Sequence, residues 1–95
     1  MTLKELSERA YKIAHKRGKT SCHATRSEIY NSIRDELNEF KEAMTQPSKH
    51  ISEFTEIEEE LADVLIATLT GMYLLGVDVD VLVQTKMLFN NKRED

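Results

Sequence analysis

A run of fourteen residues without a charge, residues 64–77, limits the folds open to this chain, and Asp63 stands directly before it. A helix that is apolar around its whole girth is a buried helix. Fourteen residues are too few to span a bilayer, which takes about 20, so we expect no membrane partner. The core of a lone domain of 95 residues is marginal. We therefore expect a homodimer or a larger homo-oligomer that buries this helix between subunits.

The composition indicates one small helical domain over residues 1–95. Only one Pro and three Gly interrupt the chain, which favours an all-α fold. The net charge of −4 argues against a nucleic-acid partner, because such proteins need a basic face. The single cysteine, Cys22, leaves no internal disulfide and fits a cytoplasmic setting. Residues 2–9 are charged from the start, so we expect no signal peptide.

Apolar periodicity and capping signals predict an up-and-down four-helix bundle with short connections. Thr2 with Glu5 and Thr25 with Glu28 form capping-box patterns, and the segment 46–48 breaks the second helix with its proline. The expected helices cover about residues 3–17, 26–44, 52–75 and 79–91. The apolar stripe of the third helix is expected at Ile57, Leu61, Leu65, Thr68, Met72 and Leu75.

Two pairs of acidic residues stand at i, i+3 spacing within these helices, Glu36 with Glu39 and Glu60 with Asp63. Residues three apart are neighbours on a helix surface. If the second and third helices pack antiparallel, the two pairs can face one another. Carboxylates are hard oxygen ligands that suit Mg²⁺, with Mn²⁺ as the second choice. Asp63, at the mouth of an apolar helix, also requires a compensating positive charge.

Spacing alone does not single out these pairs. About three acidic i, i+3 pairs are expected by chance in such a composition, and this chain has six among its 17 acids. Context selects two of them, because they flank apolar residues that a buried helix face would carry. The other acids of the region have polar neighbours and are expected to be solvated: Glu42, Glu53, Glu56, Glu58 and Glu59.

Other metal sites receive no support from the sequence. Di-iron helix bundles use Glu-x-x-His motifs, but no Glu stands three residues before His15, His23 or His50. Structural zinc sites need Cys or His pairs at ligand spacing, which the chain lacks. The three histidines are expected to be solvated or partly packed.

A second group of polar residues lies in the fourth expected helix. Lys86, Asn90 and Arg93 are spaced i, i+4, i+7, so they share one helix face. Lys and Arg bind phosphate oxygens, and Asn donates a hydrogen bond. Together with a carboxylate–magnesium centre, these three residues indicate a triphosphate held between metal and cations.

The motifs, taken in order, resemble those of the MazG-like, all-alpha nucleoside triphosphate pyrophosphohydrolases. Residues 35–43 look like the first acidic motif of that family, and residues 59–66 look like the second. Residues 86–93 are similar to its Lys-x-x-x-Asn-x-x-Arg segment, and the resemblance covers residues 3–93. It implies a MazG-like domain that assembles as a dimer or a dimer of dimers. The family pairs Glu-x-x-Glu and Glu-x-x-Asp fall on Glu36, Glu39, Glu60 and Asp63.

The resemblance implies Mg²⁺-dependent hydrolysis of a nucleoside triphosphate to the monophosphate and pyrophosphate, as nucleotide-pool housekeeping. The four acids would form the catalytic metal centre, with Glu39 as an alternative general base. Lys86 and Arg93 would stabilise phosphate charge, and Asn90 would position the phosphate chain. The alternative function is a non-catalytic helical dimer that binds nucleotides or a protein partner. A structural bundle with surface acids is the third. The preferred base stays open.

Overall fold

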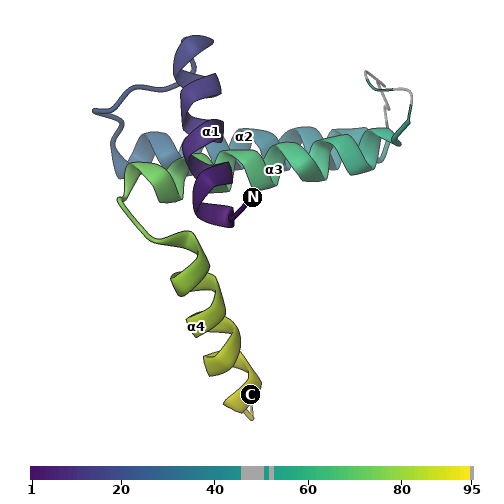
Figure 1. Cartoon of the computed structure of the whole chain (residues 1–95). Helices are drawn as coiled ribbons and strands as arrows, with labels where there is room; N and C mark the ends of the chain where they lie inside the picture. Colours follow the sequence, from purple (N-terminus) through teal and green to yellow (C-terminus); the bar gives the residue numbers. More distant parts are fainter. Residues whose placement is uncertain (46–50, 52, 95) are drawn as a thin grey trace. The chain divides into compact units, whose positions relative to one another are not determined.

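The computed structural model describes residues 1–45, 51 and 53–94, and over these residues the chain is all-helical, without strands. The helices are α1 (Leu3–Lys16), α2 (Arg26–Ala43), α3 (Glu56–Leu74) and α4 (Val79–Lys92) (Figure 1). The prediction of an all-α fold is therefore confirmed. No single helix in the described part of the chain is long and apolar enough to cross a membrane, although α3 and α4 taken together meet the same length and composition test.

Capping boxes decide where the first three helices begin. Thr2 donates its backbone N–H to Glu5 and accepts from the Glu5 N–H, both at 3.0 Å, and Thr25 forms the same motif with its own Glu at N3. The same pattern recurs before α3, where Thr55 donates to Glu58 Oε1 at 2.8 Å and accepts from the Glu58 N–H at 3.2 Å. A capping box satisfies two N–H groups that have no partner inside the helix, so α3 starts at Glu56.

The start expected near residue 52 was therefore too early. Residues 53–55 lie before the helix, because the capping box of Thr55 with Glu58 makes Glu56 the first helical residue. The expected start at Ser52 and the expected break at residues 46–48 lie outside the described residues.

The chain divides into two compact units, Met1–Thr20 with Leu69–Asp95, and Ser21–Thr68. In the first unit α1 packs against α4 and the last turns of α3. Its buried core consists of Ala10, Leu69 and Val79. Tyr11 adds a stacked contact with Tyr73, with ring centroids 4.6 Å apart. This core is small, so polar contacts contribute visibly to holding α1 in place.

Asp80 joins α4 to the N-terminus of α1. Its Oδ1 accepts from the Leu3 N–H at 3.2 Å, and its Oδ2 accepts from the Lys4 N–H at 3.1 Å. The first N–H groups of a helix have no partner inside the helix, and the helix dipole favours a negative charge there. One carboxylate from α4 therefore caps α1 across 76 residues of sequence or more.

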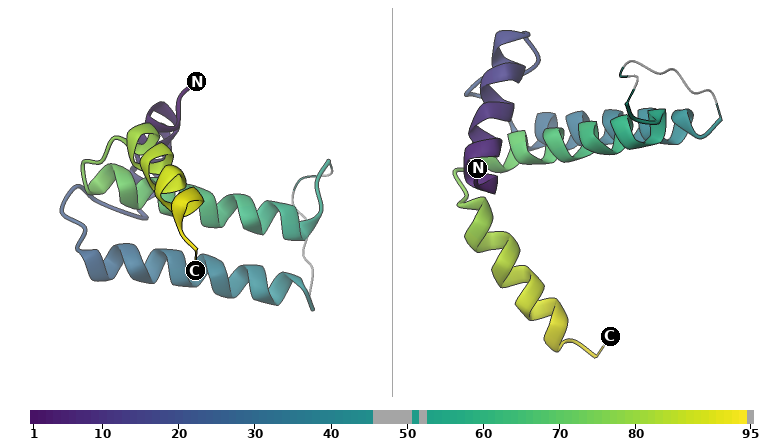
Figure 2. Two further views of the ribbon diagram at one scale, coloured as in Figure 1. Left: turned by 90° about the horizontal axis from the view of Figure 1, so that it is seen from below. Right: turned by 45° about the vertical axis from the view of Figure 1, so that its right-hand side comes forward.

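In the second unit α2 and the first part of α3 run antiparallel and side by side, as both views show (Figures 1 and 2). The buried side chains of α3 in this unit are Glu56 and Glu60, each 8% exposed. Leu61 and Leu65 of the expected apolar stripe are 51% and 54% exposed. Within one chain these leucines are uncovered, because Glu56 and Glu60 take the covered face, so the expected burial of the stripe between subunits stays a prediction.

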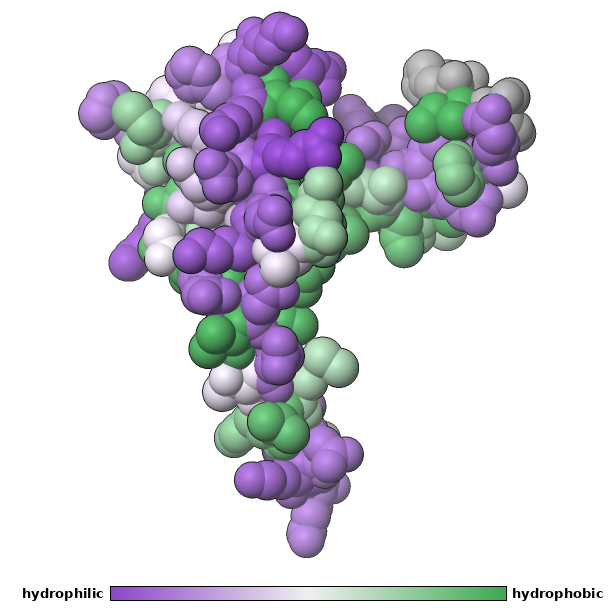
Figure 3. Space-filling view, in the orientation of Figure 1, coloured by the Kyte–Doolittle hydropathy of each residue, from purple (hydrophilic) through white to green (hydrophobic). Residues whose placement is uncertain are grey.

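Large apolar side chains also lie open on α4. Val81, Met87, Leu88 and Phe89 are all exposed, and hydrophobic atoms alternate with hydrophilic ones along this helix in the space-filling view (Figure 3). Contiguous exposed apolar side chains mark interaction surfaces in soluble proteins. The dimeric or higher state expected from the sequence stays a prediction at this stage.

We predict that Asp80→Ala lowers the free energy of unfolding by about 1–2 kcal/mol, since it removes a charged helix cap. Urea unfolding followed by circular dichroism measures the change. The control is Asp35→Ala, which removes an exposed acid whose contact with Arg34 lies on the surface and contributes little. An Asp80 variant as stable as the control variant would show that the cap does not hold α1.

Candidate metal centre

Four carboxylates from α2 and α3 meet at one place. Glu36, Glu39, Glu60 and Asp63 each offer an oxygen atom, and these four atoms all lie within 4.8 Å of one another. Each pair shares a helix face by its i, i+3 spacing, and the antiparallel packing brings the two faces together. The structure thus assembles the two acidic pairs as the sequence predicted.

The cluster reaches from the surface into the protein. Glu39 is exposed, Glu36 is half-buried and Glu60 is buried. One oxygen of Glu36 and one of Glu60, Oε2 in each case, are inaccessible to solvent and have no hydrogen-bond partner in the part of the chain that the structure describes. Buried polar atoms in folded proteins are nearly always paired. Two unpaired carboxylate oxygens within one acidic cluster therefore indicate a site for a positively charged ligand.

The electrostatics of the cluster lead to the same interpretation. Burial raises the pKa of Glu36 to about 7, with further contributions from a hydrogen bond and the charge of Glu39 and from the charges of Asp63 and Glu60. Burial also raises the pKa of Glu60, followed by a hydrogen bond from Glu56 and the charge of Asp63. Desolvation and like charges both oppose ionisation. Without a cation, the raised pKa values let Glu36 and Glu60 keep their protons to higher pH than ordinary carboxyl groups.

The donor set fits a hard divalent cation. Oxygen ligands from several carboxylates are typical of Mg²⁺, Mn²⁺ and Ca²⁺ sites, and a cation would satisfy the orphaned oxygens of Glu36 and Glu60. The same ion would convert the mutual repulsion of four acids into attraction. The arrangement defines a candidate site for such an ion, and the four oxygens alone do not select among these metals.

Glu56 belongs to this region although the sequence pattern placed it among the solvated acids. It is 8% exposed, its Oε2 is buried with no hydrogen-bond partner among the described residues, and it contributes to the raised pKa of Glu60. That expectation was wrong because polar neighbours in sequence do not decide which way a helix face points. The i, i+4 spacing of Glu56 and Glu60 was the available signal, since it puts both on one face.

Lys86 and Asn90 lie exposed on α4, and Arg93, also exposed, follows the helix as its C-cap with extended backbone. The Lys86 Nζ lies 4.7 Å from the centre of the Phe89 ring, and the Arg93 Cζ lies 5.8 Å from it. Both cations therefore lie close to Phe89, although Arg93 stands outside the helix whose continuation the i, i+7 spacing assumed. The acids belong to the unit Ser21–Thr68 and α4 to the other unit, so the role of these three residues toward a substrate stays a prediction.

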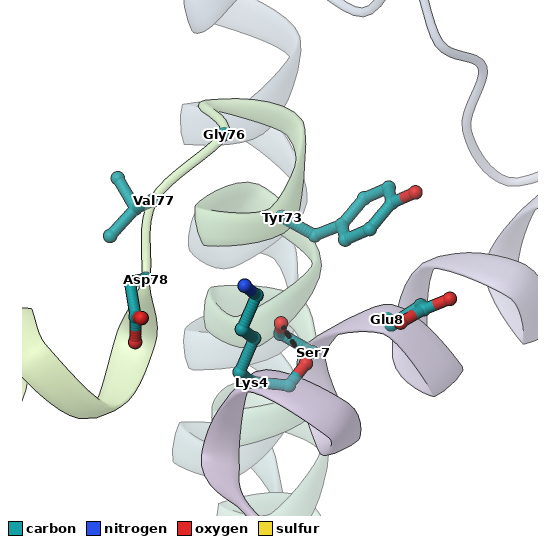
Figure 4. A pocket seen from close by; sticks show the side chains of 7 residues that line it. All are labelled: Lys4, Ser7, Glu8, Tyr73, Gly76, Val77 and Asp78. Atoms are coloured by element: carbon teal, nitrogen blue, oxygen red, sulfur yellow. Dashed lines mark hydrogen bonds between the residues drawn. The ribbon is translucent and has the colours of Figure 1, made fainter.

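A small pocket of about 210 Å³ lies in the first unit. Lys4, Ser7 and Glu8 line it from α1, with Tyr73 from α3 and residues 76–78 from the connection to α4 (Figure 4). The Ser7 hydroxyl already donates to the Lys4 carbonyl at 2.7 Å. One ammonium group and two carboxylates face a small space here, which defines no ligand chemistry comparable to that of the four-acid cluster.

Comparisons with protein-family models, with curated proteins and with solved structures found no match to this chain. The fold and the site by themselves define an all-helical protein with a four-carboxylate cluster between two antiparallel helices. This cluster is the feature of the chain that bears most directly on its function.

We predict that the protein without divalent cations becomes less stable as the pH rises between 4.5 and about 7, the ordinary and the raised pKa of Glu36. In this window the folded state keeps a proton that the unfolded chain releases, so the free energy of unfolding falls with rising pH. Thermal melts in EDTA measure the trend. Saturating Mg²⁺ should weaken it by binding the folded state. A melting temperature in EDTA that rises through this window would contradict the assigned burial.

Proposed function

We propose that this protein hydrolyses a nucleoside triphosphate to the monophosphate and pyrophosphate in a Mg²⁺-dependent reaction. The observation that carries the proposal is the convergence of Glu36, Glu39, Glu60 and Asp63, with buried oxygens that lack partners. A cluster of acids repels an anionic phosphate chain unless a cation lies between them. The site therefore fits a substrate that arrives with a divalent metal, as nucleoside triphosphates do.

Each acid has a role that its environment suggests. Glu36, Glu60 and Asp63 would hold Mg²⁺, and the burial of Glu60 with the partial burial of Glu36 would exclude water from one side of the ion. Glu39 is exposed, so it is the acid placed to complete the ligand set or to take a proton from the attacking water. A bound Mg²⁺ supplies neutralisation of phosphate charge and orientation of the phosphate chain. The α–β anhydride bond is the one whose cleavage gives these products.

The cations of α4 supply the second half of the proposal. Lys86 of α4 and Arg93, directly after the helix, both lie near the ring of Phe89, and both are exposed. Asn90 lies between them in the sequence and can donate a hydrogen bond to the same chain. The order of the acidic pairs and this Lys-x-x-x-Asn-x-x-Arg segment, which resembles that of the MazG-like enzymes, supports a nucleotide over a simple divalent cation as the ligand.

The exposed leucines of α3 support a homo-oligomer. Leu61 and Leu65 are about half exposed and lie one turn apart on the face opposite the buried acids. A second copy of the chain can cover this face, as the sequence predicted for the apolar helix. The same surface is the observation that favours the alternative function, a non-catalytic helical dimer, because it requires a partner whether or not the acids are catalytic.

We predict that Asp63→Asn abolishes Mg²⁺-dependent release of pyrophosphate while the helical circular-dichroism spectrum is kept. The substitution removes one of four anionic ligands without changing side-chain volume, so cation binding is lost. Pyrophosphate is measured after incubation with a panel of ribonucleoside and deoxyribonucleoside triphosphates, with Mg²⁺ or with EDTA.

The matched control for this experiment is Asp35→Asn, an exposed acid of α2 outside the cluster, which should leave turnover unchanged. Full activity of the Asp63 variant would reject the assigned metal centre. Nucleotide binding by the wild-type protein with no pyrophosphate release from any member of the panel would favour the non-catalytic alternative.

We predict that the wild-type protein sediments as a dimer or a tetramer, and that the double substitution Leu61→Glu and Leu65→Glu shifts it to the monomer. Charges on a buried apolar contact are costly to desolvate. Tyr30→Glu, at an exposed aromatic residue of α2, is the control and should leave the mass unchanged. A wild-type monomer at all protein concentrations would contradict the proposed assembly.

A further inference from the structure

Glu56 has the features of a ligand that the four-acid cluster does not use. Its side chain is 8% exposed, as is that of Glu60 one turn further along α3. Each of the two carboxylates keeps a buried Oε2 that has no hydrogen-bond partner among the described residues. Their i, i+4 spacing puts the two side chains on one face of α3. Two buried acids that are neighbours on one helix face, each with an unpaired oxygen, call for a compensating positive charge.

The helix N-terminus does not account for this arrangement. Acidic residues in the first turn of a helix are favoured by the dipole, and Glu56 is the first residue of α3. Glu58, however, already supplies the capping carboxylate, through its bonds with Thr55, and it does so while exposed. A favourable interaction with the helix dipole therefore does not explain why Glu56 is buried or why it lies next to Glu60.

Glu56 also does not supply a fifth ligand to the four-acid cluster. The oxygens that lie within 4.8 Å of one another come from Glu36, Glu39, Glu60 and Asp63 alone among the described residues. Glu56 contacts the cluster through Glu60, at its edge along α3. A cation held by Glu56 would thus occupy a separate position that shares Glu60 with the first.

We propose that Glu56 and Glu60 hold a second divalent cation, Mg²⁺ or Mn²⁺, next to the ion of the four-acid centre. Two carboxylates with water and phosphate oxygens are a common ligand set for Mg²⁺, and paired ions that share a ligand recur in enzymes that cleave phosphate esters and anhydrides. The inference deepens the proposed function and rests on its metal centre. The second ion would contact a phosphate chain that the first ion alone does not reach.

The test counts bound Mn²⁺ per chain from the electron paramagnetic resonance signal of the free ion, using the 95-residue protein. The wild-type protein should bind two ions, one more tightly than the other. Glu56→Gln should bind one, with the affinity of the tighter ion little changed. Glu42→Gln removes the same charge at an exposed position of α2 and should still bind two.

One bound ion in the wild-type protein, or two in Glu56→Gln, would overturn the proposal. The Gln side chain has the volume of Glu and removes a repulsive charge, so the helical fold should be kept, as circular dichroism would verify. If Glu56→Gln does not fold, Glu56→Asp replaces it. Its shorter side chain should weaken the second ion selectively, and unchanged binding of both ions would again overturn the proposal.

Pyrophosphate release, measured on the same samples, separates this inference from the proposed function. If the wild-type protein binds one ion and still releases pyrophosphate, the proposed hydrolase is supported and the second ion site is rejected. If the wild-type protein binds two ions and Glu56→Gln binds one, but neither releases pyrophosphate from any nucleotide, the second ion site is supported and the proposed hydrolase is rejected.

Discussion

Repulsion among partly buried carboxylates governs the unit formed by α2 and the first part of α3. The two helices pack through a face that carries Glu36 and Glu60, whose pKa values are raised by burial and by their acidic neighbours. Such a face is unfavourable unless protons or a cation compensate its charge. The ligand and the fold are therefore coupled in this unit, since the same ion that would bind a phosphate chain would also hold the two helices together.

The polarity of α3 is inverted relative to an ordinary amphipathic helix. In the unit Ser21–Thr68 two of its acids, Glu56 and Glu60, are covered, while Leu61 and Leu65 are exposed. The two acids and the two leucines lie on different faces of the helix. The proposed cation and the proposed second copy of the chain would therefore bind to different faces of α3.

The sequence predicted several local features correctly, namely those that depend on residues close together in the chain, and it missed features that depend on tertiary contacts. The capping boxes at Thr2 and Thr25 are confirmed because they depend only on residues three positions apart. The convergence of the acidic pairs was predicted from spacing plus an assumed antiparallel packing. The start of α3 and the burial of Glu56 were missed, the first because Thr55 was not read as a cap, the second because polar neighbours suggested solvent.

The sequence by itself determined the helices, most of their ends and the pairing of acids along each helix, since these arise from interactions between residues one turn apart. Only the tertiary structure decided which face of α3 is covered. That choice depends on how α2 and α3 meet, and it turned Glu56 and Glu60 inward, with Leu61 and Leu65 outward. It also decided that Asp80 caps α1, because contacts between distant residues depend on packing and not on local spacing.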